Sequence, residues 1–201
     1  MNTPRAHIID DDEAIRDALQ WLLKTRKIPC TTWASAEEFL AALSPDWAGC
    51  IVLDIRMEGM SGLECFDQLR SRQSPLPVIF ITGHGDVPMA VAALKNGAHD
   101  FIEKPFNDGD LLTAIQNAME FDARRRQTET ASHVISEKLT LLTAREREVM
   151  NLILEGKYNK VIADELNISM RTVEAHRSRI FEKMAVRSAV ELAQILKDVP
   201  L

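Results

Sequence analysis

Residues 50–72 read CIVLDIRMEGMSGLECFDQLRSR, and this stretch decides the fold class of the first part of the chain. It begins with a short apolar run of strand length, continues through Asp54, and ends in an amphipathic stretch, 62–72, with helical spacing. The same alternation occurs five times within residues 1–123. We therefore expect an α/β domain: a (βα)5, doubly wound parallel sheet with helices on both faces.

Ligands of such sheets bind at the carboxyl ends of the strands, so functional residues should follow the apolar runs directly. The apolar runs predict strands at 6–9, 30–33, 50–53, 77–81 and 99–102. The amphipathic stretches predict helices at 13–26, 35–43, 62–72, 86–96 and 107–123.

A polar segment, 124–138, separates this domain from the rest of the chain. It has no convincing apolar stripe, so we interpret it as a linker that is helical only at its start. We interpret its basic triplet, Arg124 to Arg126, as the cap of a helix end or a solvated face rather than a binding patch. The expected domains are therefore 1–123 and 139–201.

Residues 139–201 contain four amphipathic stretches and predict an all-α domain. Gly156 and Asn167 mark the ends of the first two helices, and Ser169 is the expected N-cap of the third. The helices are expected at 143–155, 159–166, 170–184 and 188–197.

The composition is that of a globular protein. With 201 residues, 46% of them hydrophobic, the chain can form one large core or two modest ones, which excludes a disordered or fibrous protein. Three cysteines at spacings that match no metal or redox pattern indicate a reducing compartment. No segment approaches the roughly 20 apolar residues of a membrane span, so we expect a cytoplasmic protein that contacts no membrane.

The charge is divided unevenly along the chain. Residues 138–201 hold 11 of the 24 Lys and Arg residues but only 9 of the 30 Asp and Glu residues. This surplus is too small to indicate nucleic-acid binding by itself, so such a function must be argued from where the positive side chains lie.

Carboxylates follow two of the predicted strands. The first predicted strand is followed directly by Asp10, Asp11 and Asp12, and the third is followed by Asp54. Such a cluster repels itself, and a hard divalent cation such as Mg2+, which takes oxygen ligands, relieves the repulsion. Asp12 is better placed to cap the helix that begins at Glu13. We therefore expect Asp10, Asp11 and Asp54 to form a magnesium site.

Two further strands end in polar side chains that are useful for catalysis. Thr82 follows the fourth strand, and Lys104 follows the fifth. A carboxylate nucleophile, a divalent cation, a hydroxyl and a lysine are the components of phosphoryl transfer to an aspartate, where catalysis is mainly positioning and charge neutralisation.

Four segments of the chain resemble the marker segments of response-regulator receiver domains, and the resemblance covers nearly all of residues 5–122. It implies that Asp54 accepts a phosphoryl group from the phosphohistidine of a sensor histidine kinase. The segments are IIDDDE (8–13), LDIRMEGMSGLE (53–64), ITGHGD (81–86) and FIEKPF (101–106).

The same resemblance implies roles for the neighbouring residues. Asp11 and Asp54 would bind Mg2+ directly together with the backbone carbonyl of Arg56, and Asp10 would assist through water. Phosphorylation would bias a two-state surface formed by the fourth helix, fifth strand and fifth helix. Three side chains would respond: Thr82 would move toward the phosphate, Phe101 would swing inward, and Lys104 would pair with the phosphate.

The chain departs from the family pattern at Glu58, where the family commonly has proline. This adds a carboxylate beside an acidic pocket. Our hypothesis is that Glu58 alters the metal affinity or the lifetime of the phosphoryl group. The alternative is a solvated loop residue without kinetic effect.

The third C-terminal helix has two distinct faces. Val173, Ile180 and Met184 form an inward face, and polar side chains occupy another face. The preceding helix, which begins at Asn159, and the turn at 167–169 give helix-turn-helix spacing. Amphipathicity alone leaves open a small helical bundle whose arginines are merely solvated.

The sequence of residues 139–197 resembles the LuxR-type DNA-binding domain. The combination of such a domain with a receiver resembles the FixJ/NarL class. The segments that carry this resemblance are LTAREREVMNLILEG (142–156), NKVIADELNISMRTVEAHRSRIFEKM (159–184) and SAVELA (188–193). It implies that Glu174, Ala175 and Ser178 face the bases of double-stranded promoter DNA, with Arg171 on the same helix face. Lys160, Thr172, Arg177 and Arg179 would mainly contact phosphates, and His176 is a weaker candidate because it lies at the edge of the apolar face.

The resemblance also implies that phosphorylation creates a homodimer through the fourth helix and fifth strand of the receiver, which would bind two half-sites. RNA polymerase is a further candidate partner. One rival is a phosphatase or phosphotransferase that uses Asp54 as a turnover nucleophile, but no substrate-specificity segment accompanies the acidic residues. Another is a phosphorylation-independent DNA-binding regulator with a relic receiver. We expect a transcription regulator that is not an enzyme.

Overall fold

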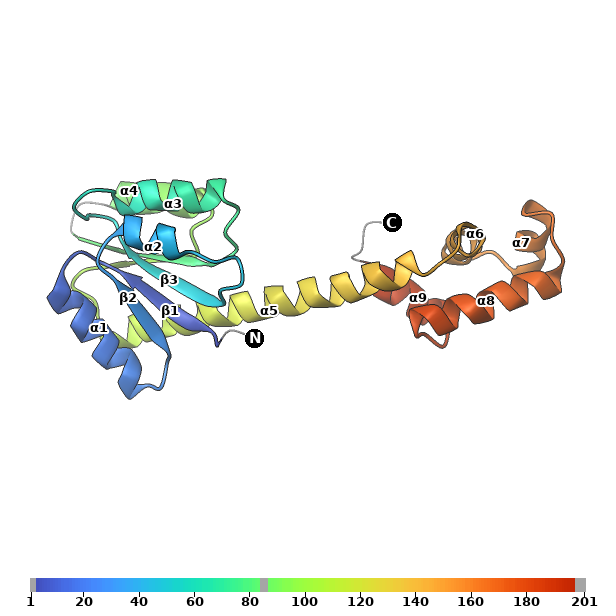
Figure 1. Cartoon of the computed structure of the whole chain (residues 1–201), viewed down its shortest axis with the longest axis horizontal. Helices are drawn as coiled ribbons and strands as arrows, with labels where there is room; N and C mark the ends of the chain where they lie inside the picture. The colour runs from blue at the N-terminus through green and yellow to red at the C-terminus, as the bar shows by residue number, and fades with distance from the viewer. Residues whose placement is uncertain (1–2, 84–86, 198–201) are drawn as a thin grey trace. The chain divides into compact units, whose positions relative to one another are not determined.

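The computed structural model describes residues 3–83 and 87–197 (Figure 1). The expected segment 81–86 therefore lies partly outside the described residues, as does the expected start of the fourth helix at Asp86. The chain divides into two compact units, Met1–Arg126 and Gln127–Leu201. Within the described residues, no helix combines the length and the apolarity needed to cross a membrane.

The first unit is a five-stranded parallel sheet, as the sequence predicted, and its strand order is β2-β1-β3-β4-β5. Its strands are β1 (Arg5–Ile9), β2 (Cys30–Trp33), β3 (Gly49–Asp54), β4 (Val78–Thr82) and β5 (Asp100–Glu103). Its helices are α1 (Glu13–Thr25), α2 (Ala36–Ala42), α3 (Gly62–Ser71), α4 (Val87–Lys95) and the beginning of α5 (Asp108–Thr140).

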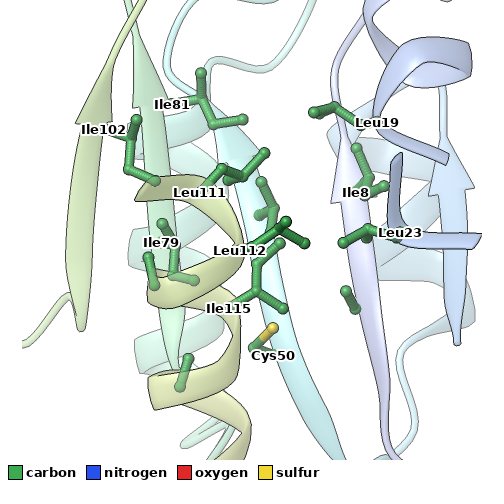
Figure 2. Close-up of a cluster of buried hydrophobic side chains, with 14 of the residues drawn as sticks. Ile8, Leu19, Leu23, Cys50, Ile79, Ile81, Ile102, Leu111, Leu112 and Ile115 are labelled. Atoms are coloured by element: carbon green, nitrogen blue, oxygen red, sulfur yellow. The ribbon is translucent and has the colours of Figure 1, made fainter. Parts of the chain in front are cut away.

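Two apolar clusters hold the helices on opposite faces of the sheet. Ile8 of β1 packs in the cluster with α1 and α5, whereas its neighbour Ile9 packs in the cluster with α2, α3 and α4. In Figure 2, Leu111 and Ile115 of α5 lie over the strands within the first cluster. Because both faces are covered, the inner strands β3 and β4 are buried along their length, which is typical of parallel sheets.

Helix α5 is longer than the sequence predicted. Segment 124–138 is helical throughout, although we expected helix only at its start. Ion pairs stabilise the first turn of this stretch, which has no apolar stripe: Arg124 with Glu120, and Arg125 and Arg126 with the buried Asp122. The basic triplet is therefore neither a helix end nor simply a solvated face.

The second unit is an all-α domain whose core lies between α6 (Ala144–Leu154), α7 (Asn159–Glu165), α8 (Met170–Met184) and α9 (Ala189–Leu196). Val173, Ile180 and Met184 of α8 are fully buried, which confirms the predicted inward face. The predicted boundaries are also confirmed: Gly156 and Asn167 have φ values of 79° and 53°, and the side chain of Ser169 accepts from the Thr172 N–H.

Candidate functional site

Three polar side chains are buried at the carboxyl ends of the central strands. Register pairs Ile9 of β1 with Leu53 of β3, so Asp10 and Asp54 follow at the same level of the sheet. Thr82 ends the adjacent strand β4. The exposed fractions of Asp10, Asp54 and Thr82 are 1%, 8% and 0%. The parallel strands thus bring together residues that lie far apart in the sequence.

The structure groups the carboxylates of Asp10, Asp11 and Asp54. One oxygen of each lies within 4.8 Å of the others, and Asp11 is the exposed member. A set of carboxylate oxygens without nitrogen or sulfur is the donor set that hard cations such as Mg2+ prefer. Asp12 stands apart as the helix cap that the sequence predicted, because its Oδ1 accepts from the Ala14 N–H at 2.9 Å.

Lys104 binds two of these carboxylates at once. Its Nζ donates to Asp54 Oδ2 at 2.8 Å and to Asp10 Oδ2 at 3.1 Å. Burial lowers the pKa of Lys104, but the hydrogen bonds and charges of the two carboxylates outweigh it and raise the pKa overall. Burial raises the pKa of Asp10, although the Asp12 N–H and Lys104 oppose the shift. The ammonium therefore offsets the repulsion within the acidic group.

Backbone N–H groups of the loop after β3 orient the acidic side chains. The Arg56 N–H donates to Asp54 Oδ1 at 3.3 Å, and the Glu58 N–H donates to Asp11 Oδ2 at 2.7 Å. Proline has no N–H group, so the proline that the family commonly has at position 58 could not make this second bond. The side chain of Glu58 is exposed.

Thr82 and Phe101 lie on neighbouring strands. The Thr82 hydroxyl donates to the Gly83 carbonyl at 3.2 Å, and the Lys104 N–H donates to the Thr82 carbonyl at 2.7 Å. Phe101 is half-buried and packs against the apolar cluster that contains α3 and α4.

Sequence reasoning missed two residues that shape this edge. Arg16 of α1 donates from its NH1 to the Asp10 carbonyl at 2.8 Å. Gly62 begins α3 so close to the Asp54 carbonyl oxygen that a Cβ there would clash with it. A glycine directly after the Ser61 N-cap was the available signal, since glycine permits such a close approach.

Helix α8 presents most of the predicted DNA-contacting residues to solvent. Arg177 is half-buried, with its guanidinium 5.4 Å from the Phe181 ring centre. His176 is also half-buried, and its buried Nδ1 has no hydrogen-bond partner within the described part of the chain. The exposed members of the predicted set are Lys160 of α7 and Arg171, Thr172, Glu174, Ala175, Ser178 and Arg179 of α8.

Comparison with protein families and curated proteins agrees with this arrangement. The response regulator receiver domain matches residues 6–116, and the luxR family of bacterial regulatory proteins matches residues 140–196. The C4-dicarboxylate transport transcriptional regulatory protein DctR of Rhodobacter capsulatus is 47% identical, covering 94% of this chain and 97% of that protein. The transcriptional regulatory protein FixJ of Azorhizobium caulinodans is 42% identical, covering 94% of this chain and 90% of that protein.

Among solved structures, the response regulator StyR superposes with a TM-score of 0.88 at 39% identity, covering 98% of this chain and 99% of that one. The receiver match spans more than half of the chain, and the relatives match it nearly end to end. The chain therefore belongs to the FixJ/NarL class of two-component response regulators, transcription regulators in which a receiver domain is followed by a LuxR-type DNA-binding domain.

Proposed function

We propose that phosphorylation of Asp54 by a sensor histidine kinase switches this regulator toward promoter binding. The observation that carries the proposal is the double hydrogen bond of Lys104, whose Nζ holds Asp54 and Asp10 at the carboxyl edge of the sheet. A fixed cation beside a carboxylate nucleophile neutralises the charge that a phosphoryl group brings.

The chemistry is a phosphoryl transfer. An oxygen of the Asp54 carboxylate attacks the phosphorus of the kinase phosphohistidine; the P–O bond forms as the P–N bond breaks, and the imidazole keeps the electron pair. Lys104 then exchanges its hydrogen bond to the Asp54 carboxylate for one to a phosphoryl oxygen. The Thr82 hydroxyl turns from the Gly83 carbonyl and donates to a second phosphoryl oxygen. Phe101 moves inward as Thr82 moves.

The acidic group fits a magnesium ion. We assign Asp11, Asp54 and the backbone carbonyl of Arg56 as direct ligands, and Asp10 as a ligand through water. Bound Mg2+ supplies further charge neutralisation at the phosphoryl oxygens. The N–H groups of Arg56 and Glu58 keep the Asp54 and Asp11 carboxylates oriented for this role.

We place the receiver domain at 1–123, a helical linker at 124–138 and the DNA-binding domain at 139–201. Within the DNA-binding domain, the exposed face of α8 is the proposed DNA-contacting surface. Recognition helices insert their N-terminal residues into the major groove. In this assignment the exposed side chains of Glu174, Ala175 and Ser178 meet base edges. Arg171 lies on the same helix face as these three. The phosphates are met by Lys160, Thr172, Arg177 and Arg179, which position the helix.

Dimerisation of the phosphorylated receiver is part of the proposal. Exposed apolar side chains of α4, namely Met89, Val91 and Leu94, support an interface at α4 and β5. A dimer would read two half-sites and so multiply the specificity of one short helix. At the promoter the bound regulator would contact RNA polymerase. The regulator would act in the cytoplasm, where the chromosome lies.

The test is binding of the purified chain to its own upstream promoter DNA, with and without acetyl phosphate and magnesium. We expect phosphorylation to tighten binding and to shift the protein to a dimer in light scattering, and we expect Asp54→Asn to abolish both effects. Equally tight binding in every case would favour a phosphorylation-independent regulator with a relic receiver. If Asp54→Asn still dimerises when acetyl phosphate is added, Asp54 is not the phosphoryl acceptor.

A further inference from the structure

A cavity of about 300 Å³ opens on the receiver unit near the amino end of β1, whereas Asp10 follows the carboxyl end of that strand. It is lined by β1, by the adjacent edge strand β2, and by the turn before β3. Arg5 and His7 belong to β1, Thr31 and Trp33 to β2, and Trp47 to the turn. None of these residues belongs to the acidic site or to the DNA-binding helix.

Aromatic rings form one wall of the cavity. The Trp47 ring stacks on His7 with centroids 4.3 Å apart and planes inclined by 8°. Trp33 lies 5.7 Å from Trp47, inclined by 29°, and both indoles are only half-buried. Half-buried, stacked indoles present a flat apolar surface on which a planar ring can lie.

His7 brings an unsatisfied donor to this wall. The Trp33 Nε1–H donates to His7 Nδ1 at 3.3 Å, so Nδ1 is the acceptor of the ring. Burial, reinforced by the charge of Arg5, lowers the pKa of His7 to about 4, so the ring is neutral at pH 7 and its hydrogen lies on Nε2. His7 is 1% exposed, and Nε2 has no hydrogen-bond partner within residues 3–83 and 87–197. A buried N–H without an acceptor costs about 1–3 kcal/mol.

Arg5 gives the cavity a positive charge. Its NH1 donates to Thr31 Oγ1 at 3.1 Å, which places the guanidinium between β1 and β2 at the solvent side of the cavity. A guanidinium has five N–H donors, and this bond uses one of them. Among the described residues, the lining contains no carboxylate that would neutralise it. A ligand here therefore meets an apolar wall and a cation, beside a buried N–H group that lacks an acceptor within the described residues.

We propose that this cavity binds a small aromatic carboxylate. The ring lies against Trp47 and Trp33, and the carboxylate accepts from His7 Nε2–H and from Arg5. A hydrocarbon would leave the His7 donor unpaired, and a cationic ligand would be repelled by Arg5. The volume suits a ligand of one or two rings, because cavities of about 150 Å³ are known to bind benzene.

The first experiment compares benzoate with its neutral isostere benzamide by calorimetric titration of the full-length chain. We expect saturable binding of benzoate and at least tenfold weaker binding of benzamide, since the loss of a charge-assisted hydrogen bond amounts to about a factor of ten or more. Absence of heat with benzoate at millimolar concentration, or equal affinity for the two probes, would overturn the proposal, because the cavity would then hold water or bind rings without selecting charge.

Two variants locate the binding. Arg5→Gln changes an exposed side chain and should weaken benzoate binding about tenfold, whereas the matched control Lys24→Gln, on exposed α1 surface outside this cavity, should leave it unchanged. His7→Phe keeps a ring in the stack but removes the donor, and it should weaken benzoate more than benzamide. If Arg5→Gln and Lys24→Gln lose affinity equally, binding reflects net charge and the assigned cavity is wrong.

Discussion

Replacement of Lys104 by methionine tests the acidic site most directly. Lys104 Nζ now bonds to Asp54 Oδ2 and Asp10 Oδ2, two carboxylates that the proposal assigns to the magnesium site. The ammonium and the metal therefore compete for the same negative charge. Methionine retains a flexible chain of similar length but has no charge and no N–H donor.

The expected magnitude follows from the two lost bonds. A hydrogen bond to a charged group contributes about 1.5–3 kcal/mol when buried, and the Lys104 side chain is 23% exposed, so we take about 1 kcal/mol for each bond. The sum of about 2 kcal/mol corresponds to roughly thirtyfold tighter Mg2+ binding in Lys104→Met. Without magnesium, the free energy of unfolding should fall by about the same amount.

The assay is calorimetric titration of magnesium into the unphosphorylated chain, with urea unfolding measured in parallel with and without the metal. Lys95→Met is the matched control, because Lys95 is exposed at the end of α4 and outside the acidic group. Magnesium affinity that is unchanged or weaker in Lys104→Met, while Lys95→Met behaves as wild type, would refute the competition between the ammonium and the metal.

Three further predictions follow from the other contacts. Asp122→Asn should lower the free energy of unfolding of the receiver by about 2–4 kcal/mol, because Asp122 is buried and paired with two arginines; a loss below about 0.5 kcal/mol in urea would contradict this. His7 has a pKa of about 4 in the folded chain and an ordinary value of 6.5, so the unfolded chain binds more protons between these values. His7 therefore contributes to the free energy of unfolding above pH 6.5, and this contribution is lost as the pH falls toward 4. Between pH 7 and pH 5, the midpoint of urea unfolding should fall less in His7→Phe than in wild type. Glu58→Pro removes the N–H that binds Asp11 and should weaken magnesium binding about fivefold. Glu58→Gln keeps that N–H and should bind magnesium as wild type does, so position 58 would act on the metal through its backbone N–H and not through the added carboxylate; equal affinities for the two variants would show that the bond is unimportant.

The sheet and the acidic group could be predicted from sequence because parallel strands share a direction. Once the apolar runs are assigned to neighbouring strands, Asp54, Thr82 and Lys104 must meet at one edge, whatever their separation along the chain. The inward face of α8 followed in the same way from helical periodicity.

Contacts between distant residues were beyond such reasoning. Asp122 accepts from the Gly49 N–H, 73 positions away, and no local pattern indicates that a carboxylate on α5 will be buried there. The extension of α5 was missed because residues 124–138 lack the apolar stripe by which a helix is identified in a sequence. In the sequence, His7 looks like an ordinary strand residue, because nothing near it indicates that its ring will stack with Trp33 and Trp47.

Residues 127–131 of α5 all have exposed side chains, whereas Leu111 and Ile115 near its beginning are buried in the receiver core and Leu139 near its end packs in the core of the second unit. Isolated helical segments of this length are marginal in water, so the middle of α5 depends on its anchored ends for nucleation. Backbone amide hydrogens there should exchange with deuterium faster than those of either end, because local opening exposes little additional apolar surface. Energetically, one continuous helix can thus behave as two anchored helices with a stretch between them that melts first.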